Sequence, residues 1–149
     1  MRFHTGCHCQ KPPTHEQANT QQDLILDIKK EIMPALNFQK QFAEAVKNGY
    51  KRQTIRSPRK NPIKIDDTLY LYTGMRTKNC EKLKEVTCSA IYDIKIKRYV
   101  CIIDQSPVFR LQSLDKIARA DGFSDWAELA RWFNKTHGLP FEGNLIYWT

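Results

Sequence analysis

No apolar run in the sequence approaches the roughly 18 consecutive residues that a membrane-spanning helix needs. The first 20 residues carry His, Gln, Pro and Thr where a signal peptide would need an apolar segment. We therefore expect a soluble, cytoplasmic protein that has no membrane partner.

The sequence also lacks a CxxC pair, and its five cysteines are odd in number, which is typical of reduced thiols rather than of a disulfide framework. Potential zinc ligands gather near the N-terminus, but their Cys-x-Cys step is tighter than the usual ligand spacing and no second pair follows. These are His4, Cys7, His8, Cys9 and His15. We expect neither a metal nor a cofactor. Cys88 and Cys101 fall in apolar strand patterns, so we expect both thiols to be buried and inert.

Acidic residues are scarce in the middle of the chain. The net charge is +8, and residues 37–103 hold 15 bases against six acids, so the whole excess of positive charge lies in the middle of the chain. Residues 47–64 hold seven bases and no acid. Such a run is a plausible binding surface for a polyanion. A solubilising surface whose basic residues cluster by chance would have the same sequence pattern.

The 149 residues are enough for one domain and an extension. Residues 1–35 are interpreted as an N-terminal extension, made of a flexible arm and a short helix that Pro34 ends. The apolar positions of that helix are Leu24, Ile25, Ile28 and Ile32. Residues 36–149 are interpreted as the domain itself.

Periodicity predicts the elements of this domain. An apolar helical face starts at Asn37, includes Phe38, and ends at Gly49. Alternating patterns predict strands, and Ser113 and Ser124 are predicted to cap two late helices. The strands are expected over 67–73, 86–96, 99–104, 108–111 and 145–148. With neither a βαβ alternation nor an internal repeat, the pattern indicates a small α+β barrel.

Four segments carry a resemblance to a known family. They are the apolar helix ending in Gly49, the basic turn 51–56, the strand 67–74, and the acidic turn 120–123 before a helix with Trp126 and Leu129. In this order they resemble an ASCH domain of the PUA-like superfamily, over residues 36–149. The ending 141–148 is similar to versions found in phages and prophages. The resemblance implies a mixed or antiparallel PUA-like β-barrel with flanking helices, which binds RNA or a modified nucleotide.

One bacterial branch of that family is an amidohydrolase. It removes the acetyl group from the exocyclic amine of acetylated cytidine, using a Lys, a Thr three residues later and a later acid. Matched by position, the resemblance implies Lys51, Thr54 and Asp121 as the catalytic residues. Two positions depart from the family pattern: Asp66 stands where Gly is usual, and Asp121 is one methylene shorter than the Glu that the family often has.

Amide hydrolysis makes specific demands on these residues. Thr54 would be the nucleophile and Lys51 its base, which requires the lysine pKa to fall well below its ordinary ~10.4. Arg52 and Arg56 could help to lower it, whereas the carboxylate of Asp121 would oppose them. Residues three apart on a regular strand point to opposite faces, so Lys51 and Thr54 converge only if the strand begins after Lys51 or contains a bulge. The alternative is a strand threonine and a solvated lysine.

Further residues are candidates for ligand binding. Arg56 could hold a phosphate as a fork, or form a surface salt bridge to Asp66 or Asp67. Tyr70 and Tyr72 could stack on bases or serve only in packing. The loop that follows could border a phosphate pocket or be an exposed basic hairpin; its candidates are Thr73, Gly74, Arg76 and Lys78.

Three functions are compatible with these residues. The first is binding of RNA, a nucleotide or a nucleoside in a basic pocket, which the charge distribution favours. The second is amidohydrolysis of acetylated cytidine. The third is a phage accessory protein that has lost its chemistry; protein partners cannot be named from the sequence.

Overall fold

The computed structural model describes residues 33–149. The predicted arm, the predicted helix that ends before Pro34 and the five potential zinc ligands lie outside these residues. Within the described part, no helix combines the length and the apolar character needed to cross a bilayer.

The described chain is α+β, as predicted, with three helices and seven strands. The first half contains β1 (Ala35–Phe38), α2 (Lys40–Lys47), β2 (Gln53–Arg56), β3 (Thr68–Thr73) and β4 (Glu81–Ile96). The second half contains β5 (Cys101–Ile103), β6 (Ser106–Val108), α3 (Leu111–Ala120), α4 (Trp126–Thr136) and β7 (Phe141–Trp148).

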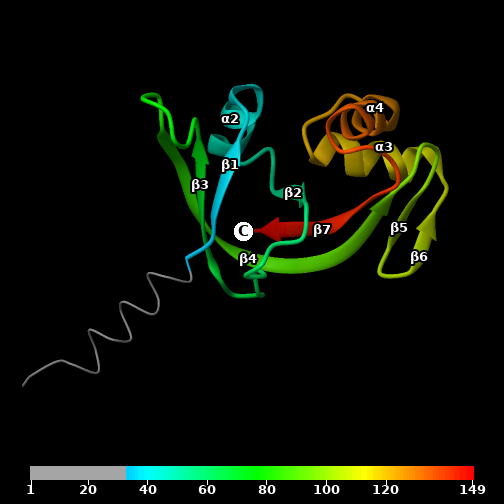
Figure 1. Ribbon diagram of the computed structural model, residues 1–149, viewed down its shortest axis with the longest axis horizontal. Helices are drawn as coiled ribbons and strands as arrows, with labels where there is room; N and C mark the ends of the chain where they lie inside the picture. The colour runs from blue at the N-terminus through cyan, green and yellow to red at the C-terminus, as the bar shows by residue number, and fades with distance from the viewer. Residues whose placement is uncertain (1–32) are drawn as a thin grey trace, which may run out of the picture. The chain divides into compact units, whose positions relative to one another are not determined.

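The long strand β4 organises the sheet. Its first part pairs with β3 and its second part with β7 and β5, all antiparallel, while β1 adds to β3 in parallel and β2 adds to β7. Figure 1 shows α2 near one end of β4 and α3 with α4 near the other, on the same side, with β2 between them. Over residues 33–149 the pairing does not return to its first strand, so the sheet is open and the predicted closed barrel is not confirmed.

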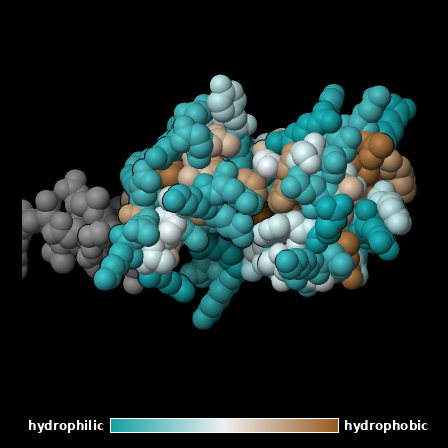
Figure 2. Space-filling view, turned by 90° about the horizontal axis from the view of Figure 1, so that it is seen from above, coloured by the Kyte–Doolittle hydropathy of each residue, from teal (hydrophilic) through white to brown (hydrophobic). Residues whose placement is uncertain are grey.

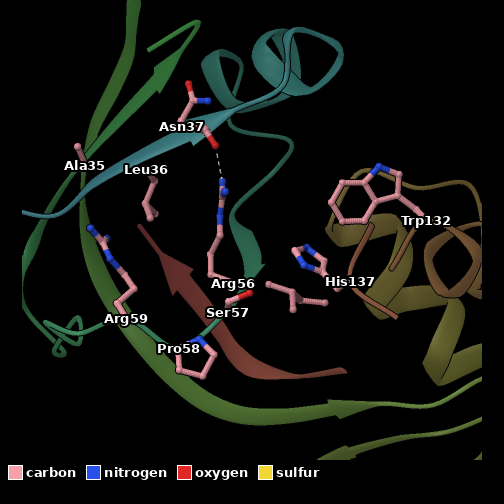
Figure 3. A pocket seen from close by; sticks show the side chains of 10 residues that line it. Ala35, Leu36, Asn37, Arg56, Ser57, Pro58, Arg59, Trp132 and His137 are labelled. Carbon is pink, nitrogen blue, oxygen red and sulfur yellow. Dashed lines mark hydrogen bonds between the residues drawn. The ribbon is translucent and has the colours of Figure 1, made fainter. Parts of the chain in front are cut away.

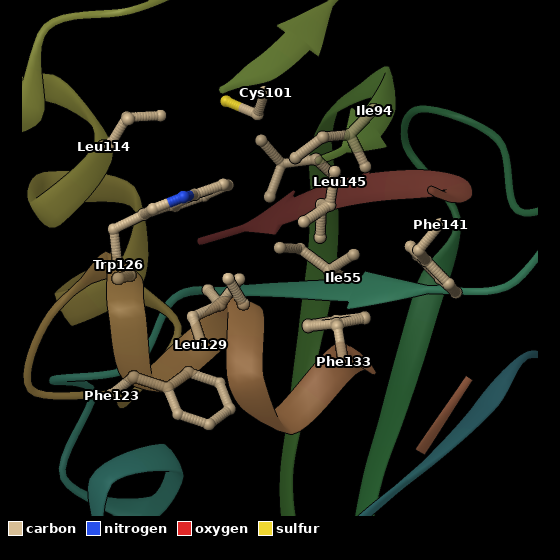
Figure 4. Packing of buried hydrophobic residues seen from close by; sticks show 13 residues of the cluster. Ile55, Ile94, Cys101, Leu114, Phe123, Trp126, Leu129, Phe133, Phe141 and Leu145 are labelled. Atoms are coloured by element: carbon tan, nitrogen blue, oxygen red, sulfur yellow. The ribbon is translucent and has the colours of Figure 1, made fainter. Parts of the chain in front are cut away.

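Two hydrophobic clusters lie along this sheet. One joins α3 and α4 to β5 and the second half of β4, and Figure 4 shows Leu129 and Phe133 of α4 facing Ile55 of β2. The other joins β1, α2 and β3 to the first half of β4. Phe42 of α2 packs against both clusters. The segment that enters β2 therefore runs through the junction of two cores.

Most predicted strands are confirmed, and the differences are local. Asn37 and Phe38 were predicted in a helix but form β1, because they pair with Tyr72 and Thr73 of β3 and this tertiary pairing outweighs local periodicity. Only Val108 of the predicted strand 108–111 is in a strand.

The late helices also begin at other residues than predicted. Leu111 already begins α3, and Arg110 rather than Ser113 precedes it. Asp125 rather than Ser124 is the N-cap of α4, because its carboxylate accepts the Glu128 amide at 2.8 Å. Ser124 instead donates its hydroxyl to the Glu128 side chain at 2.7 Å.

Candidate active site

The turn between α2 and β2 delivers Lys51 into the protein interior. Gly49 ends the helix with φ +75, a backbone conformation that glycine adopts without strain. The Lys51 amide then donates to the Ala45 carbonyl at 2.9 Å, which ties the chain to the helix it has just left. The strand β2 begins only at Gln53. The geometric condition from the sequence, that the strand begin after Lys51, is therefore met.

Lys51 forms a buried ion pair with Asp121. Its Nζ donates to Oδ1 of Asp121 at 2.8 Å, and the two side chains are 3% and 8% exposed. The same Nζ also donates to the main-chain carbonyl of Asp121. Asp121 is the C-cap of α3. Lys51, two residues before β2, therefore links the end of α3 to the segment that enters β2.

A glycine lets this helix end approach α2. Gly122 has φ +97, and a Cβ there would lie 2.8 Å from Cδ1 of Phe42. The Phe42 ring in turn contacts Phe123 edge to face, with centroids 5.6 Å apart. Any larger residue at position 122 would push Phe42 away, so this close approach needs glycine.

Thr54 lies in the same recess as the ion pair. It is 4% exposed and lines a cavity of about 90 Å³ together with Lys51 and Asp121. The walls of this inner recess are mainly aromatic: Phe38, Phe42, Phe123, Trp132 and Phe133. Lys51 Nζ lies 5.1 Å from the centroid of the Phe42 ring. The predicted trio therefore converges in one largely apolar recess.

Burial sets the protonation of the pair. Loss of water around Lys51 lowers its pKa; Asp121 opposes this effect, and the charge of Arg56 adds to it. Burial also raises the pKa of Asp121, against the opposing charges of Lys51 and Arg56. A lysine whose pKa is lowered in this way spends more of its time neutral, which is the form that can accept a proton.

Arg56 lies at the edge of the inner recess. Its guanidinium carbon is 4.8 Å from the centroid of the Phe38 ring, and Nη2 donates to the Asn37 carbonyl at 2.7 Å. Burial lowers its pKa. Its Nε is buried and has no acceptor among the described residues. The alternative salt bridge to Asp66 or Asp67 is not found in the described part of the chain.

A larger cavity of about 400 Å³ adjoins the inner recess, and we call it the outer cavity. The two share Asn37, Ile55, Arg56 and Trp132 as lining residues. Figure 3 shows Arg56 and Arg59 on one side of the outer cavity and Trp132 with His137 on the other. One cavity therefore contains the Lys51–Asp121 ion pair, and the adjoining one is lined by Arg56, Arg59 and His137.

Three predicted binding residues lie outside both cavities. Arg52 is exposed and its Nε donates to the Gly49 carbonyl at 2.9 Å. Tyr70 and Tyr72 are half-buried and alternate with the buried residues Leu69 and Leu71 along β3. These tyrosines therefore lie on the face of β3 opposite to its core side.

The loop after β3 is likewise separate from the recess. Thr73 is buried and donates its hydroxyl to the Phe38 carbonyl at 2.9 Å, which is a structural contact between β3 and β1. Thr73 and Gly74 line a third cavity, beside α2. Arg76 and Lys78 are exposed and do not line it.

Several residues of the site were missed by sequence reasoning. The helical and turn patterns of the sequence do not place Phe42 and Phe123 in a site, and nothing in the spacing of Arg59 and His137 indicates a pocket. A signal existed for two of them, because Phe42 belongs to an apolar helix face before Gly49 and Phe123 follows Asp121-Gly122 directly.

Comparison of the chain with protein-family models, with curated proteins and with solved structures found no significant match.

Proposed function

We propose that this domain is an amidohydrolase of the ASCH type, which removes an acyl group from the exocyclic amine of a pyrimidine nucleoside. The observation that supports this most is the buried recess in which Lys51 and Asp121 form an ion pair and Thr54 lines the same cavity. These three positions are the ones that the family resemblance names.

The sizes of the two cavities suit this reaction. A cavity needs at least about 10–15 Å³ to hold one water molecule, so the inner recess of about 90 Å³ has room for a small group such as acetyl. The outer cavity of about 400 Å³ lies within the usual range for ligand pockets, about 300–1,000 Å³, and suits the nucleoside. The ring of Trp132 borders both cavities and can contact the base.

The chemistry follows from the protonation of the recess. Neutral Lys51 takes the hydroxyl proton of Thr54 as the threonine oxygen bonds to the acyl carbon. The carbon–nitrogen bond then breaks, and the departing amine takes the proton from Lys51. Water attacks the acyl ester with Lys51 again as the base, which releases the carboxylic acid and restores Thr54. Asp121 holds the Lys51 amine toward the recess through this cycle.

One backbone feature also supports the family assignment. Asp66, where the family usually has glycine, has φ +71 in the turn before β3. This is the left-handed region, which glycine adopts freely and which aspartate tolerates better than most residues. The departure at this position therefore preserves the turn. A PUA-like arrangement of the strands is part of the proposal.

The test is turnover of cytidine acetylated on its exocyclic amine, followed by chromatography. We expect the parent protein to release acetate and cytidine. Thr54→Val keeps the shape of the side chain and removes the hydroxyl, and Lys51→Met removes the base, so each should lower kcat by at least about 100-fold. Thr87→Val, at an exposed threonine of β4, is the matched control and should keep full activity. No turnover by the parent protein would refute the proposal.

A second candidate function is binding of single-stranded RNA without chemistry. Five of the seven basic residues in the range 47–64 are exposed, and Figure 2 shows a face covered mainly by hydrophilic side chains. Phosphate contacts release counterions, so the affinity should fall steeply as salt rises. Binding that does not change between low and physiological salt would exclude this candidate.

A further inference from the structure

The lining of the outer cavity is positively charged. Its charged side chains are those of Arg56 and Arg59, and no carboxylate belongs to the described residues that line it. The inner recess, by contrast, includes the carboxylate of Asp121, which forms an ion pair with Lys51. The outer cavity therefore has two positively charged side chains and no negatively charged one among the described residues that line it.

Arg56 is incompletely bonded within this lining. One nitrogen donates to a main-chain carbonyl and the buried Nε has no acceptor in the part of the chain that the structure describes. Burial lowers the pKa of Arg56; the charge of Asp121 opposes this effect, and the charge of Arg59 adds to it. Two arginines that line one cavity, with no carboxylate among the described residues of that lining, are a favourable arrangement for a bound anion, because a guanidinium presents several N–H donors.

The relative position of the two cavities limits which anion fits. Trp132 lines both cavities, so a substrate whose acyl group enters the inner recess would extend past Trp132 and place its sugar in the outer cavity. A phosphate on the sugar would then lie in the same cavity as Arg59. A free nucleoside would leave this basic side of the cavity without a partner.

We propose that the outer cavity binds a phosphate attached to the substrate's sugar through Arg56 and Arg59, so that the substrate is an acylated pyrimidine nucleotide rather than a free nucleoside. This inference rests on the proposed function, because it uses the orientation that the acyl group in the inner recess imposes. The phosphate belongs either to a mononucleotide or to an RNA strand, and both present the same oxygens to the two arginines.

The kinetic test compares acetylated cytidine with its 5′-monophosphate. We expect kcat/KM to be at least about tenfold higher for the monophosphate at low salt, mainly through a lower KM, because a charge-assisted contact forms. Arg59→Gln should remove this preference, so that the two substrates are turned over with similar kcat/KM. Arg59→Lys should restore part of it. Arg98→Gln, at an exposed arginine that lines neither cavity, is the control and should keep the preference.

A binding measurement separates this inference from the proposed chemistry. Calorimetry with cytidine, cytidine 5′-monophosphate and a short cytidine-containing single-stranded RNA uses no acyl group, so its result does not depend on turnover. Tighter binding of either phosphorylated ligand than of cytidine, lost in Arg59→Gln, supports the inference, and the tighter of the two identifies the source of the phosphate. Equal binding of all three ligands overturns it, even if acetylated cytidine is hydrolysed.

Discussion

The Lys51 ammonium lies 2.8 Å from Oδ1 of Asp121, although 70 residues separate them in the sequence. Both side chains are almost completely buried. A buried ion pair is expensive to form and is often no more stable than an apolar pair of similar volume. A buried pair that lines a cavity is therefore better explained by a chemical role than by stability.

Removing one member of this pair should destabilise the protein. Asp121→Asn leaves Lys51 buried without its counter-charge, which typically costs about 3–5 kcal/mol in the free energy of unfolding. The double variant Lys51→Met/Asp121→Leu, in which neither charge is buried, should recover most of that loss. Urea denaturation of the single and double variants measures both values. A double variant no more stable than Asp121→Asn would show that the pair itself stabilises the fold.

The pH dependence of the reaction should report the lowered pKa of Lys51. The base works when neutral, so kcat/KM rises with pH through the Lys51 pKa, and this rise should lie below 10.5 because burial lowers that pKa. Asp121 raises the Lys51 pKa, so any activity left in Asp121→Asn should show its rise at lower pH. A rise that moves to higher pH in this variant would contradict the assignment of Lys51 as the base.

Stability should vary with pH for the same reason. Because the folded pKa of Lys51 is depressed, the unfolded chain binds more protons between that pKa and 10.5, and the free energy of unfolding rises with pH across this window. The double variant Lys51→Met/Asp121→Leu lacks both groups and serves as the reference. Urea titrations across this alkaline window should show the parent gaining stability relative to the double variant. A parent that loses stability relative to it would mean that the Lys51 pKa is raised.

The contact between Gly122 and Phe42 should make position 122 sensitive to a single methyl group. Gly122→Ala combines a strained positive φ with a clash against the Phe42 ring, and overpacking of this kind costs about 1–3 kcal/mol. Gly138→Ala is the matched control, because φ is +81 there and nothing lies within 4 Å of the added methyl. The difference between the two variants in thermal or urea unfolding isolates the clash. Equal losses of stability would show that Phe42 moves aside without cost.

The thiols of the described chain should differ in reactivity. Burial raises the pKa of the Cys101 thiol to about 11, and it also raises the pKa of Cys88, whereas Cys80 is exposed. Thiolates are the reactive form, so iodoacetamide near neutral pH should modify Cys80 much faster than the other two. Peptide mapping after timed labelling measures the three rates. Labelling of Cys101 as fast as Cys80 would mean that the core around β5 opens readily.

The sequence predicted much of the fold because its strands are half-buried. Along β3, Leu69 and Leu71 alternate with tyrosines, and this period of two is visible without knowing the partners. The strand β1 was missed because its four residues become a strand only by pairing with β3. A local pattern holds no information about such pairing, and Phe38 also fitted the periodicity of the following helix.

The candidate site was predictable only in part, for a similar reason. Lys51, Thr54 and Asp121 could be named because the family resemblance joins them by position, and the turn at Gly49 made convergence plausible. Phe42 and Phe123 come from helical and turn segments whose approach depends on Gly122. The outer cavity depends on how α4 packs over β2, which no spacing in the sequence reveals.

A search for a transient acyl group on Thr54 tests the central claim most directly. The parent protein would be mixed with acetylated cytidine, quenched in acid within milliseconds to seconds, digested and examined by mass spectrometry. The account predicts a transient acetyl group on the peptide that contains Thr54, absent from Thr54→Val and formed slowly or not at all in Lys51→Met. Acetate release with no acetyl group on this peptide at any quench time, or with acetylation of another residue, would contradict it.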